Sequence, residues 1–211
     1  MKRLMIAAAL GGFVSVACAQ GYAGAVRSLT RVALNCPSGE SCDTRSKGMK
    51  LYAGTKLSPS NVVDFGIGKV EAVELAYMSF GKAVATGGTM PLTEYDEPND
   101  AYITRNAPAT YKTYADALAV ALVARMPVSD EAAFTARFGL AYVSSTYRTE
   151  LDGRRHDSKT ETRLKPYIGL GFEYAVIPAL KLVGTYDRTT YDADGRKATL
   201  SMVGLGAEAS F

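Results

Sequence analysis

Apolar and polar residues alternate along much of the chain, most clearly at its end. Counting back by twos from Phe211 gives Ala209, Ala207, Leu205 and Val203, all of them apolar, and the residues between them are mostly small or polar. A period of two residues is typical of a β-strand that has one face against an apolar environment. The sequence therefore predicts a final strand that reaches the C-terminus.

Seven further segments are interpreted as strands, which gives eight in all. In chain order they are residues 22–34, 49–57, 71–80, 114–125, 132–147, 163–176 and 180–190. Among these seven, the alternation is clearest after Arg163, where Leu164 and Ile168 lie on one face and Lys165 and Tyr167 on the other. The first segment is poorly patterned, and its outer face stays unassigned.

The predicted connections differ in length. Residues 127–131 and 177–179 form tight turns, whereas residues 35–47, 82–109 and 148–160 form long polar loops. Short turns at one end and long loops at the other are typical of bacterial outer-membrane barrels. The connection at residues 58–70 is longer than this rule predicts.

Composition alone does not separate a membrane barrel from a soluble β-sandwich or a lipocalin, because mean hydropathy is close to zero. Two features favour the membrane. The chain has no tryptophan, and many of its 13 tyrosines fall near predicted strand ends, where an interfacial aromatic girdle lies. The second face of the strands is rich in glycine, alanine and charge, which suits a narrow lumen. We predict an all-β fold: an eight-stranded antiparallel transmembrane up-and-down β-barrel after a cleaved signal peptide.

The N-terminus has the pattern of a secretory signal. Lys2 and Arg3 precede an apolar run, and Ala17, Cys18 and Ala19 offer a site for cleavage. We therefore assign residues 1–19 to a signal peptide and residues 20–211 to the barrel. Lipidation of Cys18 is an open alternative.

Two cysteines remain after such processing. Cys36 and Cys42 flank a turn-rich segment, which in an exported protein predicts a loop disulfide, with free thiols as the alternative. Two thiols supply half of a tetrahedral metal site, and the only histidine, His156, lies far along the chain. No metal or cofactor is predicted.

Several short motifs resemble the transmembrane domain of OmpA-type outer-membrane proteins. They are residues 51–59 (LYAGTKLSP), 73–77 (VELAY) and 171–178 (GFEYAVIP), together with the terminal Phe211. The resemblance spans nearly the whole mature chain. It implies an eight-stranded barrel whose last strand, with Val203, Leu205 and Phe211, is recognised by the barrel-assembly machinery. Larger members of the family carry a peptidoglycan-binding domain after the barrel. The motifs named here lie in the barrel alone, so the resemblance does not imply tethering to the cell wall.

The resemblance also implies acidic residues in the lumen, at Glu74 and Glu173, paired with inward basic residues. The basic positions expected from the family are occupied by Val123 and Val183. We expect Arg137 to be the substitute partner, with Lys56 or Arg125 as alternatives; a buried carboxylate without a partner costs several kcal/mol.

An enzyme is considered because some eight-stranded outer-membrane barrels modify lipid A. His156, Ser158 and Glu161 have the composition of a Ser-His-acid set, and the His-x-Ser spacing is shared with outer-membrane deacylases. The segment is nevertheless a polar turn without apolar alternation. We expect no enzymatic activity.

Loop charge indicates possible partners. The acidic residues 94–100 contrast with basic residues in the next loop, which are positioned to pair with lipopolysaccharide phosphates. These are Arg148, Arg154, Arg155, Lys159 and Arg163. No nucleic-acid patch is found. The predicted function is structural, in the outer membrane, with loops contacting lipopolysaccharide or an adhesion partner; the alternative is a narrow ion or small-solute channel.

Overall fold

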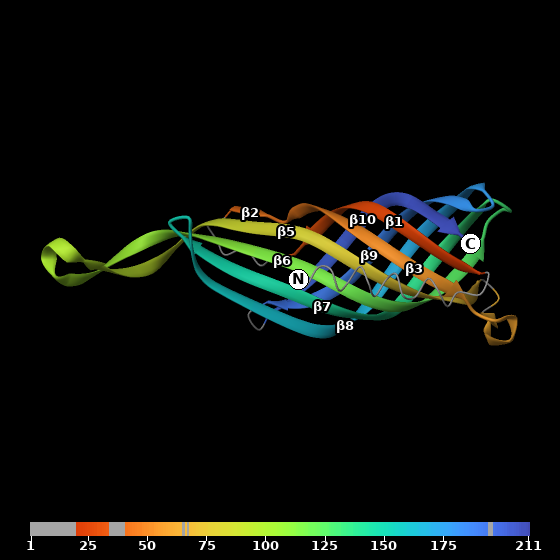
Figure 1. The fold of residues 1–211 in the computed structure, drawn as a ribbon, viewed down its shortest axis with the longest axis horizontal. Coiled ribbons are helices and arrows are strands. Elements are labelled where there is room, and N and C mark those ends of the chain that lie inside the picture. Colours follow the sequence, from red (N-terminus) through yellow and green to blue (C-terminus); the bar gives the residue numbers. More distant parts are fainter. Residues whose placement is uncertain (1–19, 34–40, 65, 67, 194–195) are drawn as a thin grey trace.

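The computed structural model describes residues 20–33, 41–64, 66, 68–193 and 196–211. Eight long antiparallel strands form its wall (Figure 1). They are β1 (Gly21–Val32), β3 (Arg45–Lys56), β5 (Lys69–Asp96), β6 (Ala101–Pro127), β7 (Ala132–Leu151), β8 (Arg154–Ile177), β9 (Leu180–Ala193) and β10 (Arg196–Ser210). Two short strands, β2 (Ser41–Asp43) and β4 (Val63–Asp64), pair with β5.

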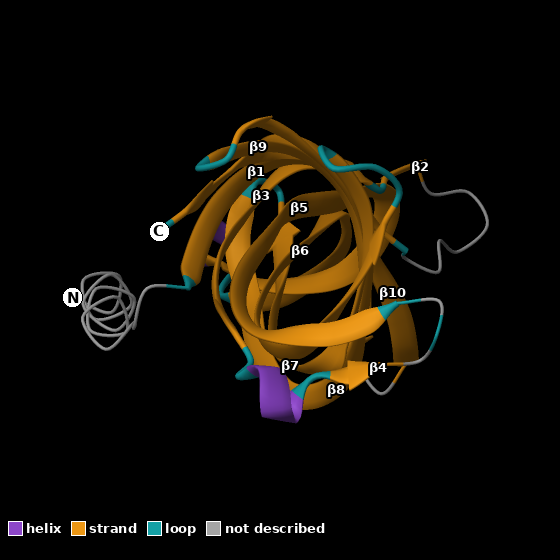
Figure 2. Ribbon diagram, turned by 90° about the vertical axis from the view of Figure 1, so that its right-hand side faces the viewer, coloured by secondary structure: helices purple, strands orange, loops and turns teal. Residues whose placement is uncertain are grey.

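The wall is closed. Each long strand pairs with its neighbours in chain order, and β1 pairs with β10 to complete the ring (Figure 2). At the seam, the backbone N–H groups of Gly21 and Phe211 donate to each other's carbonyl oxygens, both at 2.9 Å. Closure satisfies the backbone without leaving a sheet edge, which is what hydrocarbon requires. The prediction of an eight-stranded antiparallel barrel is confirmed.

Side chains alternate between the two faces of this wall as predicted. On β8, Leu164, Ile168 and Leu170 are 63%, 56% and 60% exposed on the outside. On β10, Leu205 is 78% exposed on the outside, whereas Glu208, three residues further along, is buried inside. These outer side chains form an apolar belt around the barrel.

Two predicted loops are wrong. Residues 82–109 are not a polar loop: β5 and β6 continue as a paired hairpin until Asp96 lies opposite Ala101. This hairpin projects well beyond the barrel wall (Figure 1). The sequence pattern for a longer strand was weak, because glycines and a bulge between Ser79 and Lys82 interrupt the alternation of β5.

Residues 148–160 are also mostly strand. Only Asp152 and Gly153 connect β7 to β8, and both have positive φ, at 48° and 75°. An Asp-Gly pair in this conformation forms a tight type I′ hairpin turn, so the strands continue on both sides of it.

The long connection at residues 58–70 contains a 3-10 turn, η2 (Pro59–Asn61), and β4, which pairs back onto the start of β5. A second 3-10 turn, η3 (Glu97–Asn99), lies at the hairpin tip. Among the described residues, no helix has the length and apolar character needed to cross a membrane. The signal peptide and Cys36 lie outside the described residues, and the side chain of Cys42 is not described.

Candidate functional site in the barrel interior

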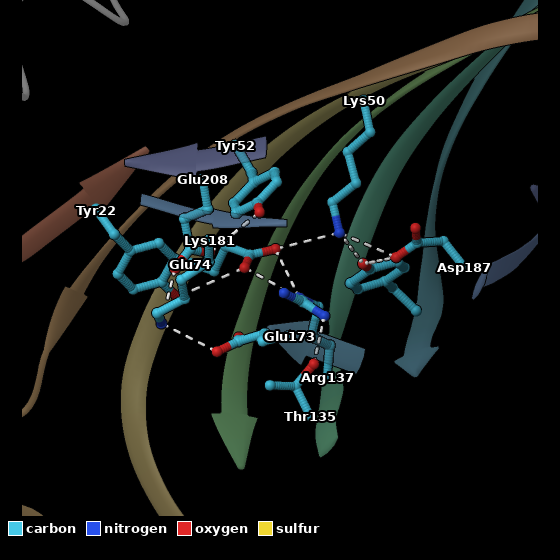
Figure 3. A network of polar contacts seen from close by, with 11 residues as sticks. Tyr22, Lys50, Tyr52, Glu74, Thr135, Arg137, Glu173, Lys181, Asp187 and Glu208 are labelled. Atoms are coloured by element: carbon cyan, nitrogen blue, oxygen red, sulfur yellow. Dashed lines mark hydrogen bonds and ion pairs between the residues drawn. The ribbon is translucent and has the colours of Figure 1, made fainter. Parts of the chain in front are cut away.

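Charged side chains from seven of the eight long strands meet inside the barrel, and Figure 3 shows most of them. We call the eight ionic residues that follow the lumen network. Its cations are Lys50, Arg125, Arg137 and Lys181, and its anions are Glu74, Glu173, Asp187 and Glu208. Four positive and four negative groups balance, so the lumen network carries no net formal charge.

The first half of the network is centred on Glu74. Its carboxylate lies 3.0 Å from Arg137 Nε and 3.2 Å from Lys50 Nζ. Lys50 Nζ also lies 3.0 Å from the carboxylate of Asp187, and it donates a hydrogen bond of 3.0 Å to the hydroxyl of Tyr167. The Tyr167 hydroxyl in turn donates to Asp187. Because Lys50, Glu74 and Asp187 have no exposed side-chain surface, each depends on the others for charge compensation.

The second half lies nearer the chain termini. Lys181 Nζ lies 2.9 Å from Glu173 and 3.0 Å from Glu208. Arg125 Nε lies 3.5 Å from Glu173 and is partly exposed, as expected at the open end of the barrel.

Two tyrosines, one bonded to each half, pack against each other edge to face. The Tyr52 hydroxyl donates to Glu208 at 3.1 Å, and the Tyr22 hydroxyl lies 3.5 Å from Glu74. Each ring lies over the glycine opposite it on the neighbouring strand: Tyr52 over Gly24 and Tyr22 over Gly54. A Cβ atom at either glycine would fall less than 2.5 Å from the tyrosine ring. The glycines therefore provide the space that the tyrosines occupy.

The lumen residues expected from the sequence, Glu74, Arg137 and Glu173, are all buried inside the barrel. Arg137 contacts Glu74, and Arg125 rather than Lys56 lies beside Glu173. Lys56 is exposed, and it forms no ion pair within the described residues. Glu74 and Glu173 belong to different halves of the network, so they share no partner.

Four ionic members of the network were not predicted from the sequence: Lys50, Lys181, Asp187 and Glu208. The signal was available, because each lies an even number of residues from a position already assigned to the inside. Lys50 precedes Tyr52 by two, and Asp187 follows Val183 by four.

An apolar layer fills the barrel between the lumen network and the hairpin end. Along β5 the inward residues change from Glu74 to Met78 and Phe80, both fully buried. Leu200 and Met202 of β10 face them within one cluster of buried apolar side chains. The inside is therefore polar in one half and apolar in the other, whereas the sequence pattern indicated an inner face rich in glycine, alanine and charge.

Beyond this layer, a cavity of about 150 Å³ opens at the hairpin end of the barrel. It is lined by Thr113, Ser145, Tyr147, Asp157, Lys159, Glu161 and Asp192. The described residues contain no cluster of metal-binding side chains.

The Ser-His-acid candidates are not arranged as a catalytic set. Ser158 is exposed on one face of β8, whereas Glu161 has the opposite parity and lines the cavity. His156 is exposed at a bulge opposite Thr149 and Glu150, five residues before Glu161. The Glu161 carboxylate lies 2.8 Å from Lys159 Nζ. The histidine therefore lacks the orienting carboxylate that the sequence had offered.

The loop cations are also largely partnered. Lys159 lies beside Glu161, Arg163 Nε lies 3.7 Å from Asp192, and the Arg148 guanidinium lies 5.0 Å from the ring centre of Tyr114. This leaves less of their charge for an external phosphate than the sequence indicated.

No curated protein matches this chain at a significant level. Several solved structures resemble it. Ail of Yersinia pestis has 10% identity and a TM-score of 0.48 over 90% of this chain and 98% of its own. Neisserial surface protein A has 12% identity and a TM-score of 0.47 over 90% and 97%. The N-terminal β-barrel domain of Pseudomonas aeruginosa OprF also has 12% identity and a TM-score of 0.47 over 90% and 97%.

A family described as outer membrane protein beta-barrel domain matches residues 5–211. The match covers nearly the whole sequence, including every strand of the closed wall. This chain therefore belongs to the outer-membrane protein β-barrel family, and its location is the bacterial outer membrane.

Proposed function

We propose that this protein is a structural outer-membrane barrel with a closed interior, and that its hairpin and loops make its external contacts. The observation that carries the proposal is the filling of the lumen by two successive layers. The charges of the lumen network neutralise one another. The apolar layer has no polar groups that could replace the hydration shell of an ion crossing the barrel. An eight-stranded barrel has room for little beyond its own side chains.

Planar-bilayer recording tests this closure against the channel alternative. The purified protein, shown to be folded by its changed gel mobility without boiling, is expected to give no steady conductance. Glu74→Ala is expected to behave in the same way, because the apolar layer remains. A steady conductance in the unmodified protein that changes in Glu74→Ala or Arg137→Ala would favour the channel.

The hairpin is the part of the molecule best placed to meet a partner. Its tip carries the acidic residues Glu94, Glu97 and Asp100, and Tyr95 and Tyr102 are 50% and 76% exposed. This composition favours a cationic partner surface with room for aromatic contacts. Cells that display the protein are expected to adhere to a polycation-coated surface better than cells that display a form lacking residues 89–106. Equal adhesion would exclude the hairpin as the contact.

The last strand supports a role in biogenesis. Val203 and Leu205 are 57% and 78% exposed on the outer face, and Phe211 ends the chain at 53%. We propose that these three side chains form the signal read by the barrel-assembly machinery. Phe211→Ala is expected to lower the amount of protein in the outer membrane without changing folding in detergent. Unchanged assembly in cells would contradict this role.

The processing expected from the sequence belongs to the same proposal. A mature protein that begins at Gln20 and has a Cys36–Cys42 disulfide would have a mass two hydrogens below its reduced form. Intact mass before and after reduction measures both features. A mass that includes residues 1–19, or one unchanged by reduction, would contradict the corresponding expectation.

A further inference from the structure

Five cations lie on the outer face of adjacent strands, and we call them the basic patch. Arg27 and Arg31 come from β1, Arg45 and Lys47 from β3, and Arg188 from β9, and all five are exposed. No ion pair involving them occurs in the part of the chain that the structure describes. They differ in this respect from the partnered cations of the loops.

The strand register brings these residues close together. Arg31 lies directly opposite Arg45, and Lys47 lies opposite Leu29, which separates Arg27 from Arg31. Ser201 of β10 lies between Arg31 and Arg188. Like charges directly opposite each other on neighbouring strands repel. One carboxylate lies nearby, that of Asp43, which accepts a hydrogen bond of 3.1 Å from the backbone N–H of Arg45.

The basic patch borders directly on the apolar belt. Arg27 is paired across the strands with Met49 and with Leu205, and Leu29 is paired with Val203. An exposed cation among lipid-facing apolar side chains is unfavourable unless an anion accompanies it. The patch lies towards the hairpin end of the wall, because β1 runs from the termini at Gly21 towards Val32.

We propose that the basic patch binds the phosphates of an anionic glycolipid of the outer leaflet, while the acyl chains of that lipid cover the apolar side chains beneath. The proposal rests on the proposed orientation, in which the hairpin faces outward. Four adjacent strands from β3 to β9 span roughly 14 Å at the usual spacing between strands. This width fits a headgroup with two phosphates on a disaccharide better than a phospholipid with one. Guanidinium groups suit such phosphates because they form paired, charge-assisted hydrogen bonds.

Binding of purified lipid A tests the proposal. The folded protein is placed in nanodiscs of neutral phosphocholine lipid, and binding is measured for bis-phosphorylated lipid A, for its dephosphorylated form and for phosphatidylglycerol. The triple variant Arg31→Gln, Arg45→Gln, Arg188→Gln is expected to bind lipid A at least tenfold more weakly, since each cation near an anionic lipid surface contributes appreciably. Raised salt is expected to weaken binding to the unmodified protein.

The matched control is the triple variant Lys56→Gln, Lys69→Gln, Arg105→Gln, which loses the same charge outside the basic patch. It is expected to bind lipid A as the unmodified protein does. Equal loss in both variants, equal binding of dephosphorylated lipid A, or equal binding of phosphatidylglycerol would each overturn the proposal. Conductance is measured in a separate experiment. A failure to bind lipid A would therefore leave the proposal of a closed barrel unaffected, and a steady conductance would refute only the closed barrel.

Discussion

The ring of Tyr52 lies over Gly24, the residue opposite it on the neighbouring strand, so closely that a Cβ at Gly24 would fall 2.3 Å from Tyr52 Cζ. The same relationship joins Tyr22 to Gly54 in the opposite direction. The two rings meet edge to face with their centres 6.2 Å apart. Residues without side chains thus determine where two hydroxyl groups of the lumen lie.

Gly24→Ala is therefore expected to displace Tyr52 and weaken its hydrogen bond to Glu208. Overpacking of this kind costs about 1–3 kcal/mol of the free energy of unfolding. Urea unfolding of the barrel in detergent, followed by tyrosine fluorescence, measures the change. The expected result is a lower midpoint with an unchanged slope.

Gly184→Ala is the control for that substitution. A Cβ at Gly184 would lie 3.5 Å from Leu205, an ordinary contact on the outer wall. Its unfolding midpoint is expected to stay close to that of the unmodified protein. If both alanines lower the midpoint equally, the effect belongs to loss of glycine in a strand and not to the tyrosine.

Lys50 has a central place in the lumen network because it contacts both Glu74 and Asp187. Lys50→Met would leave the buried Asp187 without its cation, and breaking a buried pair in this way costs about 3–5 kcal/mol. The unfolding midpoint in urea is expected to fall sharply. A loss no larger than that of an exposed Lys56→Met variant would contradict the assigned role.

The double variant Lys50→Met, Asp187→Asn separates charge from packing. Removing the carboxylate charge together with its cation is expected to restore part of the lost stability, because the unpaired buried charge is gone. If the double variant is less stable than Lys50→Met by the full effect of Asp187→Asn alone, the two side chains are not coupled.

The wall of the barrel was predictable because alternation is a local property. In the strands from β5 to β10, residues such as Leu164 and Tyr167 indicate the outward and inward faces. Because one face contacts lipid, the alternation of apolar and polar residues is maintained along each strand. The hairpin was missed for the same reason. Towards the tip of the hairpin both faces of the two strands are exposed to water, and residues near Arg105 no longer need to alternate.

The partners inside the lumen were only partly predictable. Their odd or even position along each strand assigns Lys50, Glu74 and Asp187 to the interior. It does not give their relative heights along the barrel axis. Those heights depend on the shear of the closed sheet, which brings residues 137 positions apart, Lys50 and Asp187, within hydrogen-bonding distance. Alternation alone likewise does not indicate that Met78 and Leu200 meet as an apolar layer.

The apolar layer leads to a prediction about permeation. Replacing Phe80 and Met202 with serine is expected to hydrate this half of the lumen and to raise the open-channel current in planar bilayers above background. Glu74→Gln alone is expected to stay silent. Current in Glu74→Gln with none in the double serine variant would assign closure to the lumen network instead.

Arg105 ties the projecting hairpin to the neighbouring turn, since it lies 3.2 Å from Glu94 on its own hairpin and also pairs with Asp152 between β7 and β8. These carboxylates raise the pKa of Arg105, with hydrogen bonding to Asp152 as the largest cause. Because the side chain is exposed, Arg105→Ala is expected to leave the unfolding midpoint unchanged. It is expected instead to free the hairpin, so that limited proteolysis cuts between residues 88 and 107 faster than in the unmodified protein.

Lys69→Ala, which removes the exposed pair with Asp64, is the control and should keep the original rate of cleavage. Equal rates in all three proteins would show that the hairpin keeps its position without Arg105.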